Sequence, residues 1–331
     1  MNSADQTNNE KEKVESEKPK KKLHHDWHGA SIALFFGILG VVGARLGYLW
    51  IGFDVISQFE FQSIMLAAAA VLGLAVPRYK GLVTSIFFVI FVTAYGMWPH
   101  VASAIRAPSV TAIAGEHNLK VASFNTLYTN QDNAGIVTSV LNMNADVTTL
   151  IEMGVNKNQV LEALKSNYPY QAGCQANDEC EMAIISKFPL TNIVSKGMWV
   201  GSPLIQATVD IGNGPITILG VHTTRFPHFR AQFTQVKELI KYVETIHGHV
   251  VMMGDFNSTP FSRVNKTISV ALGFKRLTNL PTWPATFNFS QFAIDHIFVS
   301  SGIRAASGEQ IGDNAGSDHY PVTLTLGIAD K

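Results

Sequence analysis

Several short apolar segments of this chain end on a polar or ionisable residue, and this repeated pattern limits the folds the chain can adopt. The run at 249–253 is apolar and rich in β-branched residues, which is typical of a buried strand. Gly254 predicts a tight turn, with Asp255 and Asn257 just past the strand and their side chains on one side. Taken alone, this Gly-Asp-Phe-Asn sequence also fits an Asx turn that caps a strand.

The same pattern recurs through the last two-thirds of the chain. Predicted strands alternate with segments of helical spacing, which indicates an α/β domain. The strands are expected at 119–125, 146–152, 181–186, 204–210, 217–222, 249–253, 293–299 and 320–326, and the helices at 134–141, 160–166 and 233–246. Polar residues at many strand ends are typical of a site assembled at one edge of a sheet. They are Asn125, Glu152, His222, Asp255, Asn257, Asp318 and His319.

The first third of the chain differs sharply in composition. Residues 1–27 are polar and rich in lysine, which predicts a disordered tail. Apolar stretches follow at 29–53, 64–76 and 81–98. A bilayer-spanning helix needs about 20 apolar residues, so the first and third stretches qualify. The second is short unless 59–62 extend it, and a re-entrant segment is the alternative. A cleaved signal peptide is disfavoured, because the first apolar stretch begins late and two more follow.

Loop charges predict how these segments cross a membrane. The lysine-rich tail and the basic loop 78–80 indicate the cytoplasmic side, whereas the loop 52–62 has no Lys or Arg and indicates the outside. The third span then places the rest of the chain outside. We therefore expect a multi-pass protein of the bacterial inner membrane with a periplasmic or extracellular domain. Arg45 lies within the first predicted span, where it faces another helix, extends to the interface or has a functional role.

The two cysteines agree with an exported domain. Cys174 and Cys180 bracket a short polar loop in the region placed outside, and in an oxidising compartment such a pair predicts a disulfide. A two-cysteine metal site is the alternative, but no further cysteine or nearby histidine completes it. The expected organisation is a tail at 1–27, a membrane region with two to three transmembrane helices at 28–100, a linker at 101–116 and a catalytic domain at 117–331.

Six short motifs of the last domain resemble those of a known superfamily. They are 124–126 (Phe-Asn-Thr), 150–152 (Leu-Ile-Glu), 220–222 (Gly-Val-His), 254–257 (Gly-Asp-Phe-Asn), 294–296 (Ile-Asp-His) and 316–322 (Gly-Ser-Asp-His-Tyr-Pro-Val). Their order resembles that of the endonuclease/exonuclease/phosphatase superfamily, with its DNase I-like fold. The resemblance implies a four-layer sandwich in which two mixed β-sheets pack face to face and helices flank them. Segments 183–190 and 281–285 are also similar to bacterial members.

The residue types suit hydrolysis of a phosphoester. Glu152 is a hard oxygen ligand suited to Mg²⁺, with Mn²⁺ or Ca²⁺ as alternatives, and Asn125 and Asp318 can complete the ligand set. His319 is the candidate base or stabiliser of the phosphorane, and Asp295 would fix its tautomer. The remaining candidates are Asp255 and Asn257, which would position the attacking water, and His222, which would protonate the leaving oxygen or bind phosphate.

Other charged residues have two interpretations. Arg225 and Arg230 follow the His222 segment and either contact substrate phosphates or belong to a solvated loop. His296 follows Asp295 on a strand, faces the other side and is expected to be structural.

The expected function is a membrane-anchored, metal-dependent phosphodiesterase or nuclease in which water attacks phosphorus in line. In the superfamily, a histidine at the position of His222 marks secreted nucleases, sphingomyelinases and inositol-phosphate phosphatases. A phospholipase C or sphingomyelinase-like headgroup hydrolase, or an inositol-phosphate-type phosphatase, is therefore the alternative. A non-catalytic binding module is disfavoured by the intact motifs. Balanced charge gives no electrostatic footprint for long nucleic acid, and nothing in the sequence indicates a protein partner.

Overall fold

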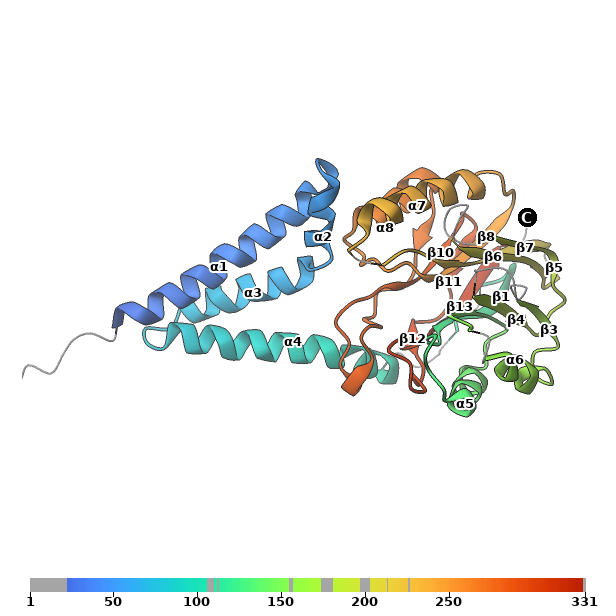
Figure 1. Ribbon diagram of the computed structural model, residues 1–331, viewed down its shortest axis with the longest axis horizontal. Coiled ribbons are helices and arrows are strands. Elements are labelled where there is room, and N and C mark those ends of the chain that lie inside the picture. Colours follow the sequence, from blue (N-terminus) through green and yellow to red (C-terminus); the bar gives the residue numbers. More distant parts are fainter. Residues whose placement is uncertain are drawn as a thin grey trace, which may run out of the picture.

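A computed structural model describes residues 23–105, 110–111, 113–154, 157–173, 181–196, 203–212, 214–225 and 227–329. Most of the predicted tail and the predicted disulfide of Cys174 and Cys180 lie outside the described residues. Figure 1 shows two parts, a bundle of long helices built from the first third of the chain and a body of sheets and helices built from the rest.

The helical bundle contains three long helices that lie side by side. Its elements are α1 (Leu23–Arg45), η1 (Leu46–Tyr48), η2 (Ile51–Phe53), α2 (Asp54–Ser57), α3 (Glu60–Leu74) and α4 (Lys80–Ile105). By length and composition, α1 from His28 onward and α4 could cross a membrane, whereas α3 is apolar but shorter. Two predicted boundaries shift. The first helix begins at Leu23, inside the predicted tail, and α4 continues to Ile105, inside the predicted linker.

The first apolar stretch, 29–53, forms a long helix only as far as Arg45. α1 ends at Arg45, and the chain then passes through short helical turns before α3 begins. The Arg45 guanidinium pairs with the carboxylate of Glu60, which is buried at the first turn of α3. Arg45 therefore lies at a helix end, where it joins two helices, and not in the middle of a span.

Two mixed β-sheets form the centre of the second part. The first sheet has the order β11-β13-β1-β2-β4-β3, with β12 also paired to β13, and the second has the order β5-β6-β7-β8-β10-β9. The strands of the first sheet are β1 (Glu116–Asn125), β2 (Val147–Ile151), β3 (Tyr170–Gly173), β4 (Met182–Ser186), β11 (Ile303–Ala305), β12 (Gln310–Ile311) and β13 (Val322–Ala329). Those of the second are β5 (Thr191–Lys196), β6 (Leu204–Asp210), β7 (Pro215–His222), β8 (His249–Asp255), β9 (Lys275–Arg276) and β10 (Asp295–Val299).

Three apolar clusters hold the layers together. The largest joins the facing sides of the two sheets, for example Val121 and Ile184 of the first sheet with Ile218 and Val251 of the second. The outer faces are covered by helices, α5 (Asn133–Met143) and α6 (Asn158–Leu164) on the first sheet and α7 (Phe229–Val243) and α8 (Arg263–Leu272) on the second. This helix–sheet–sheet–helix arrangement is the predicted four-layer sandwich; η5 (Thr286–Asn288) lies in a loop before β10.

Strand register brings the polar strand ends together. β1 and β2 are parallel, and Asn125 pairs with Ile151, the residue before Glu152. In the second sheet, His222 pairs with Asp255 across the parallel strands β7 and β8, and Asp295 pairs with Asp255 across the antiparallel strands β8 and β10. Because the two sheets pack face to face, these ends meet at one edge of the sandwich.

The structure explains the glycine at position 254 differently from the sequence-based prediction of a turn. It lies inside β8 and makes no turn there. A Cβ atom at this position would lie 1.9 Å from the carbonyl oxygen of Val221 on β7, and its φ of +156° is one that side chains disfavour. Glycine is therefore required by the close approach of β7 and β8 beside Asp255.

Candidate active site

The carboxylate of Asp255 is the centre of the polar cluster. Its Oδ2 accepts a hydrogen bond from Asn125 Nδ2 at 3.1 Å and lies 3.8 Å from His222 Nε2 and 3.7 Å from His319 Nε2. Asn257 Nδ2 also reaches this oxygen, at 3.3 Å. Asp255 is fully buried, so these neighbours come from both sheets onto one oxygen with little access to solvent.

The loop after β2 places Glu152 on the other side of Asn125. The amide of Asn125 also donates to Glu152 Oε1 at 3.0 Å, and the backbone N–H of Tyr128 donates to Oε2 at 2.8 Å. Glu152 has a φ of +58°, a conformation that costs a non-glycine residue energy and therefore needs support from its surroundings. His222 Nε2 lies 3.8 Å from Oε1 of this carboxylate.

A fully buried lysine supplies that support. The Lys157 ammonium donates to the backbone carbonyls of Leu127 at 2.5 Å, Tyr128 at 3.3 Å and Glu152 at 3.1 Å. It thereby ties the loop after β1 to the loop after β2. The sequence analysis missed Lys157, because a single lysine in a polar loop has no pattern that distinguishes it from a solvated one.

The surroundings of Glu152 and His222 favour an ionised Glu152 carboxylate beside a neutral His222 imidazole. Burial raises the pKa of Glu152, but the hydrogen bonds from Asn125 and Tyr128 and the nearby histidines outweigh it, so the pKa lies below its usual value. Burial lowers the pKa of His222, and Glu152 opposes this only in part. His222 is therefore uncharged near neutral pH and able to exchange a proton at Nε2.

A buried ion pair occupies the other side of Asp255. His319 Nδ1 lies 2.8 Å from Asp295 Oδ2, which directs the other ring nitrogen toward Asp255. Burial alone would lower the pKa of His319, but the carboxylates of Asp295 and Asp255 raise it to about 10. Burial also raises the pKa of Asp255, to about 7, against the opposing charge of His319. The predicted pairing of Asp295 with His319 is thus present.

Asp318, the third predicted metal ligand, contacts Trp283 and lies near His319. Its Oδ2 accepts a hydrogen bond from Trp283 Nε1 at 3.0 Å, and its Oδ1 is 4.0 Å from His319 Nε2. Two groups of potential ligands with closely spaced donor atoms occur among the described residues, and neither includes Asp318. They are Glu152, His222 and Asp255, and Asp255, Asp295 and His319. Trp283 was not assigned a role from the sequence.

The side of the cluster around Glu152 fits a hard divalent cation. Glu152 is ionised, partly accessible and grouped with His222 and the Asp255 carboxylate, and carboxylate oxygens are the ligands that Mg²⁺ prefers. The Asn125 amide turns its nitrogen toward both carboxylates, while its oxygen accepts a hydrogen bond from the backbone N–H of Leu127 at 3.0 Å. The second group is less suited, because His319 is paired with Asp295 and carries the proton of that pair.

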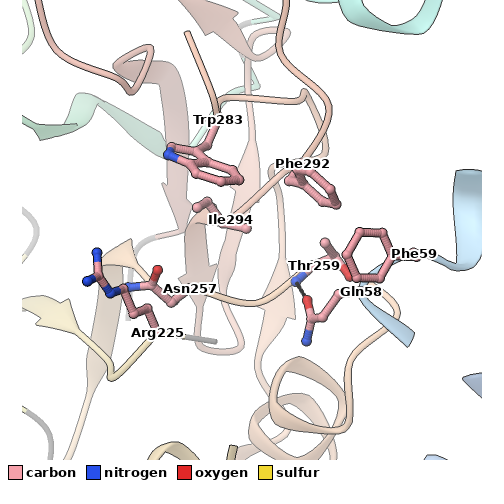
Figure 2. A pocket seen from close by; sticks show the side chains of 8 residues that line it. All are labelled: Gln58, Phe59, Arg225, Asn257, Thr259, Trp283, Phe292 and Ile294. Atoms are coloured by element: carbon pink, nitrogen blue, oxygen red, sulfur yellow. Dashed lines mark hydrogen bonds between the residues drawn. The ribbon is translucent and has the colours of Figure 1, made fainter. Parts of the chain in front are cut away.

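The remaining candidates divide into near and distant residues. Arg225 is exposed and lines a pocket together with Asn257, beside the cluster (Figure 2). Arg230 is exposed in the first turn of α7 and is not among the residues lining that pocket. His296 is fully buried, with Nε2 2.9 Å from the carbonyl oxygen of Ser258, so the prediction of a structural histidine is confirmed.

Solved structures share this fold. SmcL covers 64% of this chain and 99% of its own at 18% identity, with a TM-score of 0.54. A beta toxin variant from Staphylococcus aureus with bound magnesium ions covers 64% of this chain and 100% of its own at 18% identity, with a TM-score of 0.51. Sphingomyelinase C from Streptomyces griseocarneus covers 64% and 99% at 13% identity, with a TM-score of 0.50.

Family membership follows from the sequence itself. No curated protein matches the chain. Residues 122–319, more than half of the chain, match the Endonuclease/Exonuclease/phosphatase family, and the match includes every clustered residue from Asn125 to His319. The protein described here, with its two packed sheets and a polar site at their shared edge, therefore belongs to the Endonuclease/Exonuclease/phosphatase family of phosphoester hydrolases.

Proposed function

We propose that this protein is a membrane-anchored phosphodiesterase that depends on a divalent metal and hydrolyses its substrate by in-line attack of water on phosphorus. The observation that carries the proposal is the convergence of Asn125, His222 and His319 on Asp255, with Glu152 and Asp295 one contact further out. In-line displacement at a phosphoester requires a group that orients the attacking water and groups that stabilise the developing charge. A carboxylate and two imidazoles can supply these functions.

Asp255 and Asn257 would orient the attacking water. The backbone N–H of Asn257 donates to Asp255 Oδ1 at 2.7 Å, and its side-chain amide donates to the carbonyl oxygen of Thr223 at 2.9 Å. These bonds fix both side chains before substrate arrives, which lowers the cost of reaching the transition state. Asp255 Oδ2 is then directed at the space between the two histidines.

The two histidines have different tasks. Asp295 holds His319 at Nδ1, so Nε2 faces the cluster and would donate a hydrogen bond to a phosphoryl oxygen as charge develops. His222 is about one-quarter exposed and, being uncharged near neutral pH, would donate a hydrogen bond to a phosphate oxygen, the second of its two predicted roles. Of the two roles predicted for His319, this geometry supports the stabiliser of the phosphorane.

Glu152 would hold the metal together with Asn125, whose amide oxygen must exchange its bond to the Leu127 N–H for the ion, and with Asp318 as the third predicted ligand. A bound Mg²⁺, or Mn²⁺ or Ca²⁺ in its place, would polarise the phosphoryl oxygen and neutralise developing charge. Arg225, at the rim of the site, would bind a substrate phosphate oxygen. Arg230 has the same proposed role at a greater distance.

The membrane anchor is supported by the surfaces of the long helices. Phe35 of α1 is 61% exposed and Val89 of α4 is 61% exposed, and many large apolar side chains on these helices are similarly uncovered. Such a surface is unfavourable in water and favourable in lipid. The α2 end of the bundle meets the catalytic domain, and the turn with Arg78 lies at the other end (Figure 1). This arrangement is compatible with the proposed periplasmic or extracellular domain of a bacterial inner-membrane protein.

Hydrolysis by the full-length protein in detergent micelles tests the proposal. The substrates are plasmid DNA, RNA, sphingomyelin, an inositol polyphosphate and methyl p-nitrophenyl phosphate, each with Mg²⁺ or with a chelator. We expect cleavage of at least one diester with Mg²⁺ that is lost in the Asp255→Asn variant. Activity that survives both the chelator and this substitution would refute the proposal.

A further inference from the structure

A pocket adjoins the candidate active site and reaches the membrane region. Its volume is about 140 Å³ and its lining is mainly apolar. The residues that line it are Gln58, Phe59, Arg225, Asn257, Thr259, Trp283, Phe292 and Ile294. Figure 2 shows Arg225 and Asn257 at one end, the aromatic rings of Trp283 and Phe292 above, and Phe59 at the opposite end. The pocket therefore joins a polar end to an apolar end.

The membrane region supplies one wall of this pocket. Gln58 and Phe59 lie between α2 and α3, more than 160 residues before Arg225, the first lining residue of the catalytic domain. The Gln58 amide oxygen accepts a hydrogen bond from the backbone N–H of Thr259 at 2.7 Å. The ring of Phe59 packs edge to face on Phe292, with ring centres 5.4 Å apart. The wall is thus held in place by contacts on either side of the pocket.

Other contacts fix the same interface away from the pocket. Asp54 Oδ1 accepts a hydrogen bond from the backbone N–H of Arg263 at 2.6 Å, and Gln62 Nε2 donates to the carbonyl oxygen of Gln291 at 3.0 Å. Phe261 stacks on Phe61 with ring centres 6.4 Å apart. Because several contacts hold the two parts together, one lining side chain can be truncated without separating them.

The polar end of the pocket belongs to the active site. Asn257 lines the pocket and donates to the Asp255 carboxylate, while Trp283 lines it and donates to Asp318. Arg225 adds the positive charge that attracts a phosphate. A ligand whose phosphodiester lies at Asp255 would therefore extend an adjoining apolar group between Trp283, Phe292 and Phe59.

We propose that the pocket binds the apolar part of a membrane phospholipid, so that the substrate is a lipid phosphodiester taken from the leaflet beside the catalytic domain. This inference rests on the proposed function and on the proposed membrane anchor. Phe59 is 42% exposed and Trp50, in the same connection, is 55% exposed. Aromatic residues in this position are typical of the boundary between lipid and water. Aromatic rings also stack on nucleobases, but this wall belongs to the proposed membrane region, and the chain's net charge of zero offers nucleic acid no general attraction.

The size of the pocket limits what enters it. A cavity near 150 Å³ holds a group about as large as benzene. The pocket therefore takes the atoms next to the phosphodiester and the first few methylenes, while the rest of each acyl chain stays in the bilayer.

Alkyl p-nitrophenyl phosphates with methyl, butyl and octyl groups test the pocket without assuming a headgroup. We compare the full-length wild type in detergent with Mg²⁺, Phe59→Ala and Phe261→Ala. The control Phe261→Ala removes a ring of similar exposure, 37% against 42%, from the same interface but outside the pocket. We expect kcat/KM to rise by about tenfold or more from methyl to butyl and little further to octyl, because about 0.8 kcal/mol per buried methylene is gained only within the pocket.

Two results separate the pocket from the proposed function. The rise from methyl to butyl should shrink in Phe59→Ala and persist in Phe261→Ala. A rise that is equal in all three proteins, or that continues to octyl as partition into micelles would, overturns the lipid pocket but leaves the phosphodiesterase intact. The lipid pocket is also overturned if plasmid DNA is cleaved in preference to phospholipid vesicles and the rate does not depend on alkyl length.

If no ester is cleaved, the proposed function fails. A binding measurement then tests whether the pocket takes an apolar group. Calorimetry with methyl and butyl phosphate then gives the affinity of the pocket for its ligand. Tighter binding of butyl phosphate in the wild type and in Phe261→Ala, but not in Phe59→Ala, supports the pocket. Equal binding of the two phosphates by all three proteins overturns it.

Discussion

The two sheets position their halves of the active site by different means. On the second sheet, Asp255 and Asp295 lie within strands, and paired backbone hydrogen bonds set their places. On the first sheet, Glu152 lies in a loop past its strand with a strained backbone, held by the side chain of Lys157. The position of a strand residue is fixed by backbone hydrogen bonds to the neighbouring strands, whereas a loop residue needs a side chain elsewhere to hold it in place. We therefore expect the second-sheet half to depend on strand pairing and the first-sheet half to depend on the single side chain of Lys157.

The largest effect should come from Asp255→Asn. We expect a loss in kcat of about 10²–10⁴ that excess Mg²⁺ does not restore, because the substitution removes the carboxylate that orients water. Glu152→Gln should instead be rescued in part by high Mg²⁺, since it weakens metal binding. The measurement is kcat as a function of Mg²⁺ concentration for both variants. Equal rescue of both would mean that the two halves do not divide the chemistry in this way.

Gly254→Ala should destabilise the second-sheet half most strongly among backbone changes. The new Cβ would meet the Val221 carbonyl oxygen, so β7 and β8 must separate. We expect a loss of roughly 3 kcal/mol in the free energy of unfolding, as for overpacking within a tightly packed region. Gly173→Ala is the matched control, because nothing lies within 4 Å of its Cβ position. Chemical denaturation measures both, and equal stability of the two variants would contradict the close approach of the strands.

Lys157→Met should loosen the first-sheet half specifically. It keeps the apolar stem but leaves three backbone carbonyls without the ammonium. We expect Mg²⁺ affinity to fall by about 10- to 100-fold, as for other residues that orient a metal ligand. Lys165→Met removes a largely exposed lysine and serves as the control. Calorimetric titration with Mg²⁺ checks this, and an unchanged affinity would show that Glu152 holds its conformation unaided.

The pH dependence of stability tests the pairing of His319 with Asp295. The pKa of His319 is raised from 6.5 to about 10, so its protonated form stabilises the fold fully below pH 6.5. That contribution is lost as pH rises toward 10. The stability difference between the wild type and His319→Gln should thus be constant below pH 6.5 and shrink above it. Thermal unfolding at a series of pH values measures this difference. A stability difference between the two proteins that grows as pH rises would contradict the prediction.

Eight strand positions were predictable, because each of these strands is an apolar run with its own boundary signals. The short or exposed strands β3, β5, β9, β11 and β12 were not predicted. The predicted 204–210 coincides with β6, and 217–222 lies within β7. The helix α8 was missed even though Ser262 caps its start and Gly273 ends it in the left-handed conformation. Its apolar residues Val264, Ile268 and Leu272 also recur every four residues, so a periodic signal was present as well. The signal extends over only ten residues.

Gly254 and Arg45 show where local interpretation fails. A glycine before a polar strand end predicts a turn, and an arginine inside an apolar stretch predicts a charge within a span. In the structure, a neighbouring strand requires the glycine, and a carboxylate from the next helix pairs with the arginine. Both reasons lie in a partner that is distant along the chain or across a turn, which no local pattern reveals.

The sequence by itself determined the α/β class, eight of the strands and the polar residues at their ends, because hydrophobic periodicity and residue type are local properties. Only the tertiary structure decided that these ends converge on Asp255, that Lys157 supports Glu152, and that Phe59 of the helical bundle faces Phe292 beside the site. The physical reason is that register, sheet packing and the docking of the helices depend on contacts between residues far apart in the chain, and these contacts exist only once the whole core has formed.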